Sequence, residues 1–446
     1  MGMASSLLHA AVQRCLRATV RRDLARETRL ARRLRACDVR AAWQHSSNAA
    51  TVFANRMRAE SAGYRELLER ARIPSPITAA TWAGLPILTK TDFRRSSDSW
   101  YGTAVRAEEV VWTYTSGSTG EPFKFPLSKA SRTAEAAAQE LNLLAVGWKP
   151  TMGRATIKVQ TKAPVGLRKF YRELIGNREI GFSAADFRVQ HVPAMVERLR
   201  AEQISYLRGY STSIYLFAQE VLRRGLSCTI PLITTLGESL SPKQAEVVER
   251  AFGGRVYRDY GGSEAMHVGF ECVERNGYHV DLGRFYVEII RDGRPAAPGE
   301  PGDIVVTAFS NAAMPLVRYR IGDIGSWSAN DSPCPCGNRL PLMAEVLGRS
   351  ADVVVTSTGH VINVPLLVVV FEYAQEHIEQ FKVIQQGRDR FDVLWVARHD
   401  RAADEIPALQ RELAAKCGGG VSFDWHHVAE IPPDKSGKRR ILVPLH

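Results

Sequence analysis

Hydroxyl-bearing residues and glycines alternate directly after an apolar stretch that we predict to be a strand, Val110–Tyr114. The alternating segment consists of Thr115, Ser116, Gly117, Ser118, Thr119 and Gly120. Glycines let the backbone approach an anion closely, and consecutive N–H groups form a nest that binds phosphate. Lys124 follows as a possible counter-charge. The pattern lacks the Gly-x4-Gly-Lys-Ser/Thr order of a Walker loop. It therefore predicts a phosphate loop of another kind, or else an ordinary Ser/Gly-rich turn.

A second group of residues could bind a metal ion. Three cysteines and one histidine match the stoichiometry of a closed structural zinc site: Cys272, His279, Cys334 and Cys336. A disulfide between cysteines two residues apart would be strained. We predict a structural Zn2+ that stabilises a β-rich segment, and the alternative is a set of buried thiols beside a surface histidine. His267 is a further candidate ligand or pocket residue. We expect the other cysteines to be small core residues: Cys15, Cys37, Cys228 and Cys417.

Further short motifs occur in a fixed order after the Ser/Gly-rich segment. They are Leu236–Ser239 (LGES), Tyr260–Glu264 (YGGSE), Arg318–Asp323 (RYRIGD), Gly348–Asp352 (GRSAD), Thr358–His360 (TGH) and Pro433–Lys438 (PDKSGK). Taken alone, the Gly-Asp pair at 322–323 indicates a turn, and the Ser-Gly-Lys run at 436–438 indicates a loop. The ordered set is much more specific than any member of it.

With this ordered set the sequence resembles the adenylate-forming superfamily of acyl-CoA synthetases, peptide-synthetase adenylation domains and luciferases. The resemblance covers about Val110 to Arg440. It is greatest to the phenylacetate–CoA ligase group and its capsule-biosynthesis-like relatives, which share the compact length, the Tyr-Gly-x-Ser-Glu variant and the stretch FECVERNGYHVD. Some relatives in that group carry a structural metal at similar cysteines. The resemblance implies an enzyme that activates a carboxylate with ATP and then transfers the acyl group to a thiol.

The resemblance also implies how ATP is bound. The loop at 115–120 would hold the β- and γ-phosphates. Tyr260 would pack on adenine, and Asp323 would accept hydrogen bonds from the ribose hydroxyls. Gly237, Glu238 and Ser239 would form the opposite wall of the adenine site, and Arg349 would contact the ribose–phosphate region. Gly261 would also contact the nucleotide.

Three residues are implied to act on the reacting groups: Thr119, Glu264 and Lys438. Glu264 would hold Mg2+, a hard cation that prefers oxygen ligands. Lys438 would reach the bridging oxygens and the carboxylate, since the reaction has to neutralise charge between two anions.

The C-terminal unit would swing between the half-reactions, with Gly359 and His360 lining the thiol tunnel. The sequence departs from the family at Ala351, in the expected hinge, and at Phe123, which separates Pro122 from Lys124.

The acid pocket should lie beside Gly237 and Gly261, with Tyr210 and Met266 as linings, although ordinary core packing explains these two equally well. Small glycines near the reacting carboxyl group favour a flat aromatic acid. The acceptor is coenzyme A or the phosphopantetheine arm of an acidic acyl carrier protein. The alternatives are an acyltransferase to an amine or hydroxyl acceptor, and a non-catalytic nucleotide-binding scaffold.

Arginines and leucines interleave at helical spacing over residues 14–35. The pattern is typical of an amphipathic helix, and helical patterning continues to residue 72. Three interpretations remain: a solvated face of an ordinary helix, a docking surface for an acidic partner or membrane, and a cleaved organellar presequence. The first 40 residues carry a net charge of +7 out of +12 for the whole chain, so the basic character is local. This distribution argues against a nucleic-acid binder.

Beyond residue 110, short apolar strands alternate with helical stretches, which predicts an α/β fold with a largely parallel sheet. Residues 284–328 switch to closely spaced strands and predict a β-rich subdomain. We expect a large N-terminal adenylation domain over 1–347, helical over 1–72, and a small mobile α+β domain over 348–446.

The composition bounds the class of protein. The chain has 446 residues, of which 45% are hydrophobic and 24% charged, which excludes a disordered chain, a collagen-like repeat and a small disulfide scaffold. An apolar run of about 18 residues is absent, so we expect no membrane span. The cysteine spacing is not that of a secreted framework, which favours a reducing, cytoplasmic compartment.

Overall fold

The structure is a computed structural model of the chain. It describes residues 22–95, 97–103, 105–114, 124–158, 179–184, 189–237, 240–262, 264–330, 332–349, 353–357, 361–363, 367, 370–371, 374, 377–417, 420–432 and 440–445.

Helices open the described chain: α2 (Arg22–Ala36), α3 (Val39–Glu60) and α4 (Ala62–Arg70). The side chain of Asp38 caps α3, and the side chain of Ser61 caps α4. A capping oxygen satisfies backbone N–H groups that have no partner inside the helix, and so it fixes where each helix begins.

The Arg-rich segment is part of the packed structure from residue 22 onward. Leu34 of α2 is buried. Arg35 donates to the Oδ1 atom of Asn142, on the later helix α6, at 2.6 Å. In its described part this segment is therefore a packed helix on which Arg26, Arg29, Arg32 and Arg33 are exposed, and the docking of a partner on them stays a prediction. Residues 1–21 lie outside the described chain.

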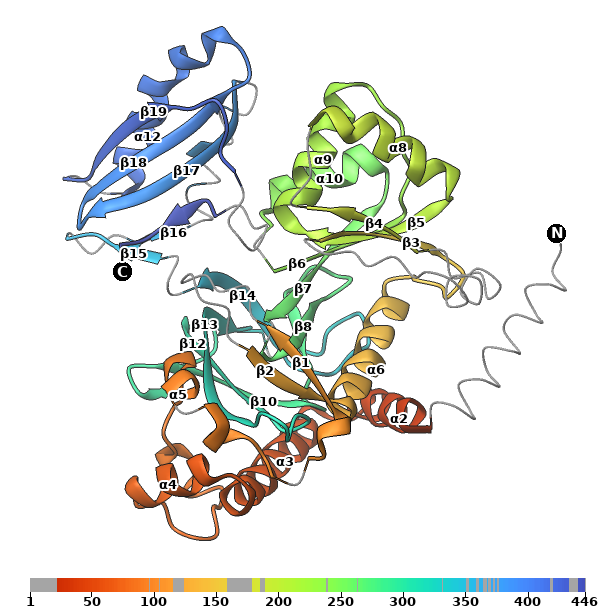
Figure 1. Ribbon diagram of the computed structural model, residues 1–446, viewed down its shortest axis with the longest axis vertical. Coiled ribbons are helices and arrows are strands. Elements are labelled where there is room, and N and C mark those ends of the chain that lie inside the picture. The colour runs from red at the N-terminus through yellow and green to blue at the C-terminus, as the bar shows by residue number, and fades with distance from the viewer. Residues whose placement is uncertain are drawn as a thin grey trace, which may run out of the picture.

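One 12-stranded sheet runs through the molecule in the order β11-β10-β12-β13-β14-β9-β8-β7-β6-β5-β3-β4 (Figure 1). Its parallel part contains β3 (Gly153–Lys158), β4 (Glu179–Ser183), β5 (Ile204–Tyr210), β6 (Leu232–Leu236) and β7 (Arg255–Gly262). Its antiparallel part contains β8 (Met266–Glu271), β9 (Tyr278–Val280), β10 (Phe285–Arg291), β11 (Arg294–Pro295), β12 (Gly302–Ala308), β13 (Leu316–Trp327) and β14 (Leu342–Arg349). Strand β7 pairs in parallel with β6 and antiparallel with β8, so the sheet changes character there.

Helices cover both faces of the parallel part. The first face packs against α8 (Val192–Ala201), α9 (Ser211–Arg223) and α10 (Pro242–Phe252). The opposite face packs against α6 (Lys129–Ala145), because residues such as Tyr206 and Tyr257 join Leu143 of that helix in a separate apolar cluster. This double covering explains the continuous apolar runs of these strands.

Strand β1 (Val110–Tyr114) lies at the predicted position but does not join the large sheet. It pairs antiparallel with β2 (Lys124–Ser128) in a two-stranded sheet, with Tyr114 opposite Lys124. The Ser/Gly-rich segment is therefore the connection of a hairpin, and the large sheet is mixed because its other half is antiparallel. Strand length and apolar character alone do not decide which neighbour a strand selects.

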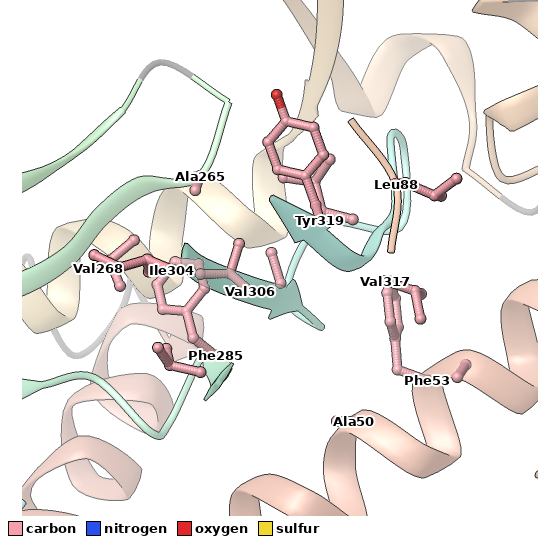
Figure 2. Packing of buried hydrophobic residues seen from close by; sticks show 14 of the residues in the cluster. Ala50, Phe53, Leu88, Ala265, Val268, Phe285, Ile304, Val306, Val317 and Tyr319 are labelled. Carbon is pink, nitrogen blue, oxygen red and sulfur yellow. The ribbon is translucent and has the colours of Figure 1, made fainter. Parts of the chain in front are cut away.

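The main core lies between the antiparallel part and the N-terminal helices. Phe53 of α3 packs below Val317 of β13, while Val268 of β8 lies near Ile304 and Val306 of β12 (Figure 2). The short helix α5 (Lys90–Arg95) comes after α4 in the chain. Just before it, the backbone of Leu88 forms an isolated parallel β-bridge with Tyr319 of β13. Short 3₁₀ helices occur at Trp82–Gly84, Ser97–Trp100, Ala107–Glu109, Val189–His191 and Asp400–Glu405.

The C-terminal unit has its own sheet and core, coloured blue in Figure 1. A four-stranded sheet runs in the order β19-β18-β17-β20, and β15 pairs with β16 separately. The elements are β15 (Val353–Val355), β16 (Val361–Asn363), β17 (Ile378–Gly387), β18 (Arg390–Ala397), α12 (Ile406–Cys417), β19 (Ser422–His427) and β20 (Leu442–Val443). The predicted fold class, α/β with a β-rich part and a smaller α+β unit, is confirmed.

Candidate active site and metal centre

Two of the sequence motifs meet through one hydrogen bond. The hydroxyl group of Tyr260, near the end of β7, donates to the Oδ2 atom of Asp323 on β13 at 3.0 Å. Tyr260 is only 8% exposed. Asp323 also lies opposite Arg349 in the β13–β14 ladder. The residues predicted to bind adenine, the ribose and the ribose–phosphate region thus lie close together in the backbone. Nothing is described of the Arg349 side chain.

The β7–β8 hairpin requires a glycine at its centre. A Cβ atom on Gly261 would lie 1.8 Å from the carbonyl oxygen of Met266, so any side chain there would displace the backbone. Met266 itself has a φ of 58°, a left-handed conformation that is uncommon for residues with a side chain. The close approach of the two strands fixes where the described residues Tyr260, Gly261, Gly262 and Glu264 lie, at the end of β7 and in the turn to β8.

Gly237 and Tyr210 lie next to this hairpin. Leu236, at the end of β6, is in register with Asp259 on β7 and with Tyr210 on β5. Gly237 follows with a φ of 78°, which glycine adopts at little cost. The register therefore brings the predicted pocket residues Tyr210, Gly237 and Gly261 to adjacent strand ends.

Glu264 occupies the turn between β7 and β8. Its Oε1 atom lies 3.3 Å from the Nζ atom of Lys90, the first residue of α5. A carboxylate suits Mg2+, and a cation at this position would compete with the ammonium group for Glu264. Lys90 is a functional candidate that sequence reasoning missed, because it stands in none of the motifs.

Several predicted site residues lie outside the described part of the chain. They are Thr115, Ser116, Gly117, Ser118, Thr119, Gly120, Glu238, Ser239, Gly359, His360 and Lys438. The described residues on either side of the predicted phosphate loop are adjacent, because Tyr114 faces Lys124. The Nζ atom of Lys124 lies 4.7 Å from the ring centroid of Trp112.

A buried charged network lies on the other side of β7 from Tyr260. Asp259 receives a hydrogen bond at its Oδ1 atom from His267 Nδ1 at 2.5 Å, and its Oδ2 atom lies 3.2 Å from Arg208 Nη2. Burial alone would raise the pKa of Asp259, but His267, Arg208 and Lys158 outweigh burial and lower it. Burial, assisted by the neighbouring arginines, lowers the pKa of Lys158 to about 8. A sequence signal for this network did exist: Lys158, Arg208 and Asp259 are charged residues within otherwise apolar strands.

The predicted metal ligands converge on one point. One ligand atom from each of Cys272, His279, Cys334 and Cys336 can be chosen so that all lie within 4.8 Å of one another. The Sγ atoms of Cys272 and Cys334 are 3.4 Å apart, and His279 Nε2 lies 3.2 Å from Cys336 Sγ. A disulfide needs an S–S distance of about 2.05 Å, so these thiols are not bonded to each other. Bonds of about 2.0–2.3 Å from a tetrahedral ion would fit in the space between them.

The surroundings of His279 suit a metal ligand. Its Nδ1–H group donates to the carbonyl oxygen of Leu340 at 2.9 Å, which directs the Nε2 lone pair at the cysteines. Burial is the main cause of a lowered pKa for His279, which favours the neutral ring that a metal ligand needs. Cys272 directly follows β8, His279 lies in β9, and Cys334 and Cys336 lie in the loop before β14. In that loop the backbone N–H of Arg339 donates to the carbonyl oxygen of Arg35 in α2.

The fold and the motifs define an adenylate-forming ligase architecture. The structure of 2-hydroxyisobutyryl-CoA ligase, in the postadenylation state with R3-HIB-AMP, superimposes with a TM-score of 0.73 at 15% identity, covering 92% of this chain and 91% of that chain. At this identity the likeness establishes the fold.

Sequence comparison identifies the nearer group. Residues 354–444 match the CapK C-terminal domain. The protein CapK of Staphylococcus aureus is 24% identical over 88% of this chain and 86% of its own length. The phenylacetate–coenzyme A ligase of Thermus thermophilus is 27% identical over 61% of each chain. The protein is thus homologous to CapK and phenylacetate–CoA ligases and has the adenylate-forming fold, so the resemblance read from the motifs is confirmed.

Within the described residues, the structure contains no helix with the length and apolar character that a membrane crossing requires.

Proposed function

We propose that the protein is an AMP-forming acid–thiol ligase. It would activate a carboxylic acid as an acyl-adenylate and transfer the acyl group to coenzyme A or to the phosphopantetheine arm of an acyl carrier protein. The observation that supports this most is the Tyr260–Asp323 hydrogen bond. It joins two motifs that are 63 residues apart in the sequence, and Glu264 follows Tyr260 in the turn after β7.

In the first half-reaction a carboxylate oxygen attacks the α-phosphorus of ATP. The bond from this phosphorus to the pyrophosphate oxygen breaks, and pyrophosphate leaves. Tyr260 would orient adenine and Asp323 the ribose, while Lys438 would neutralise charge as the two anions approach. Positioning and charge neutralisation provide most of the rate enhancement in such reactions.

In the second half-reaction a thiol sulfur attacks the acyl carbon, its proton is released, and AMP leaves. Gly359 and His360 would line the thiol path, with the C-terminal unit over 348–446 moving between the two steps. Strand β14 continues through Arg349 and pairs with β13, so a hinge would lie immediately after this ladder.

Two metal ions belong to the proposal. Glu264 would hold Mg2+, which supplies positive charge against the phosphates. Cys272, His279, Cys334 and Cys336 would hold Zn2+ in a closed structural site. The proposed substrate is an aromatic acid, since Gly237 and Gly261 leave room for a flat ring beside Tyr210 and Met266.

The test is carboxylate-dependent ATP–pyrophosphate exchange with Mg2+, across aryl and aliphatic acids. We expect exchange with at least one acid and none without an acid. The Asp323→Ala variant should raise the KM for ATP by roughly one to two decades, because it removes charge-assisted hydrogen bonds to the ribose. Binding of ATP without exchange for any acid would favour a non-catalytic scaffold.

The match to CapK supports a second candidate, a transferase that passes the activated acyl group to an amine or hydroxyl. Product analysis separates the two. After the best acid has been identified, coenzyme A, an acyl carrier protein and a small amine are each offered with ATP. A thioester product supports the ligase, and an amide or ester formed in preference supports the transferase.

A further inference from the structure

The buried charged network has the position of a ligand site. Lys158 is the last residue of β3, Arg208 lies two residues before the end of β5, and Asp259 lies near the end of β7. Ala155 and Ile157 point into the apolar cluster beneath α8 and α9, so Lys158 points to the opposite face, which α6 covers. Open α/β sheets bind ligands at the carboxyl ends of their parallel strands.

The acceptor atoms of this network are already occupied. Both oxygens of Asp259 accept hydrogen bonds, one from His267 and the other from Arg208 and from Gln139 of α6. Glu135, also on α6, has its Oε1 atom 3.1 Å from His267 Nε2. The carboxylates therefore have partners within the protein.

The donor atoms are only partly occupied. The Arg208 side chain is 9% exposed, and its buried Nε–H group has no hydrogen-bond partner in the described residues. The Nε atom of Arg154, on the same face of β3, is buried in the same way. No described carboxylate lies within ion-pair distance of the Lys158 ammonium group. A buried donor without an acceptor is costly, so this arrangement fits a ligand that supplies oxygen acceptors.

The network is also close to the reacting groups. His267 follows Glu264 by three residues, so their Cα atoms are at most about 11 Å apart even with the chain extended. Asp259 directly precedes Tyr260 and points to the other face of β7, because side chains alternate along a strand. A small acid with its reacting carboxyl group near Glu264 could therefore place its far end beside Arg208 and Lys158.

We propose that Arg208 and Lys158 bind a second anionic group, a carboxylate, on the acid that the enzyme activates. Asp259 and His267 hold Arg208 in position and are positioning residues. The inference rests on the proposed acid activation and names its substrate class. An acid with a purely hydrocarbon end would leave the Lys158 ammonium group without an acceptor among the described residues and the buried Nε–H group of Arg208 unpaired. Sites with unmatched polar groups discriminate strongly.

The experiment compares acids of one carbon skeleton in ATP–pyrophosphate exchange: hexanoate, adipate and aminohexanoate, followed by benzoate and isophthalate. For the wild-type enzyme we expect kcat/KM for the diacid to exceed that for the monoacid by at least about tenfold. The Lys158→Met variant should reduce this diacid-to-monoacid ratio toward one, and Lys158→Arg should restore most of it. The control, Lys129→Met, changes an exposed lysine at the start of α6 and should keep the wild-type ratio.

The outcomes separate this inference from the function on which it rests. Exchange that is equal for monoacid and diacid, with a ratio that Lys158→Met leaves unaltered, overturns the inference and preserves the ligase. A preference for aminohexanoate also overturns it, since the network would then bind a cation. No exchange with any acid counts against the proposed function itself. If Lys158→Met is poorly folded, the neutral polar variant Lys158→Gln takes its place, and a diacid-to-monoacid ratio equal to that of the wild-type enzyme then overturns the inference.

Discussion

Strand β8 has a buried polar cluster at each end, and the two clusters differ in one respect. At its start, His267 joins Asp259 and Arg208 in a charged network with unused donors. Directly after its end, Cys272 joins three other ligand atoms that all face one another. The cysteine cluster is closed and would be completed by one ion, whereas the charged network is open and would be completed by a substrate. A buried polar cluster whose atoms all face one another thus favours a role in stability, and one with donors that lack acceptors favours a role in recognition.

This comparison predicts that substitutions at the closed cluster mainly change stability and that substitutions at the reacting groups mainly change rate.

The largest effect should come from Cys272→Ser. Loss of one ligand should remove the ion and lower the free energy of unfolding by about 3–5 kcal/mol. Zinc analysis of the purified protein and urea unfolding measure the two changes. Cys228→Ser is the matched control, because that cysteine is buried and lies outside the cluster. An equal loss of stability in both variants would mean that the four residues are plain buried groups.

Lys438→Ala should give the opposite pattern. We expect the adenylation rate to fall by two to three decades, or about 3–4 kcal/mol of transition-state stabilisation, because a positioned charge is lost. The free energy of unfolding should not change. Single-turnover formation of the adenylate measures the rate, and Lys416→Ala, on exposed α12, is the control. A fully active Lys438→Ala enzyme would remove this residue from the mechanism.

The open network predicts an intermediate effect on pH dependence. The pKa of Lys158 is about 8 in the folded chain against 10.5 in model compounds. Between these values the unfolded chain binds the proton and the folded chain does not, so this residue makes stability rise with pH from about 8 to 10.5. Relative to Lys158→Met, the wild-type protein should gain about 2–3 kcal/mol of unfolding free energy over that range. Urea unfolding at a series of pH values would show parallel curves if Lys158 were freely solvated.

Tyr260→Phe should have the smallest effect. It removes one hydrogen bond to Asp323 and keeps the ring, so the KM for ATP should rise only about two- to tenfold. Steady-state kinetics with saturating acid measure this change, and kcat should stay close to the wild-type value. A large fall in kcat would show that the hydroxyl group acts beyond positioning Asp323.

Local signals in the sequence were enough to predict many of the helices and strands. The ranges Leu232–Leu236 and Pro242–Phe252 were readable because apolar periodicity, Pro and Ser caps and glycine ends are local signals. The convergence of Cys272, His279, Cys334 and Cys336 could be predicted because few roles other than metal binding require cysteine and histidine in that spacing. The order of the predicted nucleotide-binding motifs could likewise be read from the sequence without any knowledge of their contacts.

Which residues meet became visible only in the three-dimensional fold. That β1 pairs with β2 and not with the large sheet, and that Lys90 faces Glu264, depends on contacts between distant segments. Arg208, Asp259 and Lys158 come from three different strands, and each alone is an ordinary charged residue. Strand order and register brought them to one face, because backbone pairing is non-local and a one-residue change of register would turn every side chain to the other side.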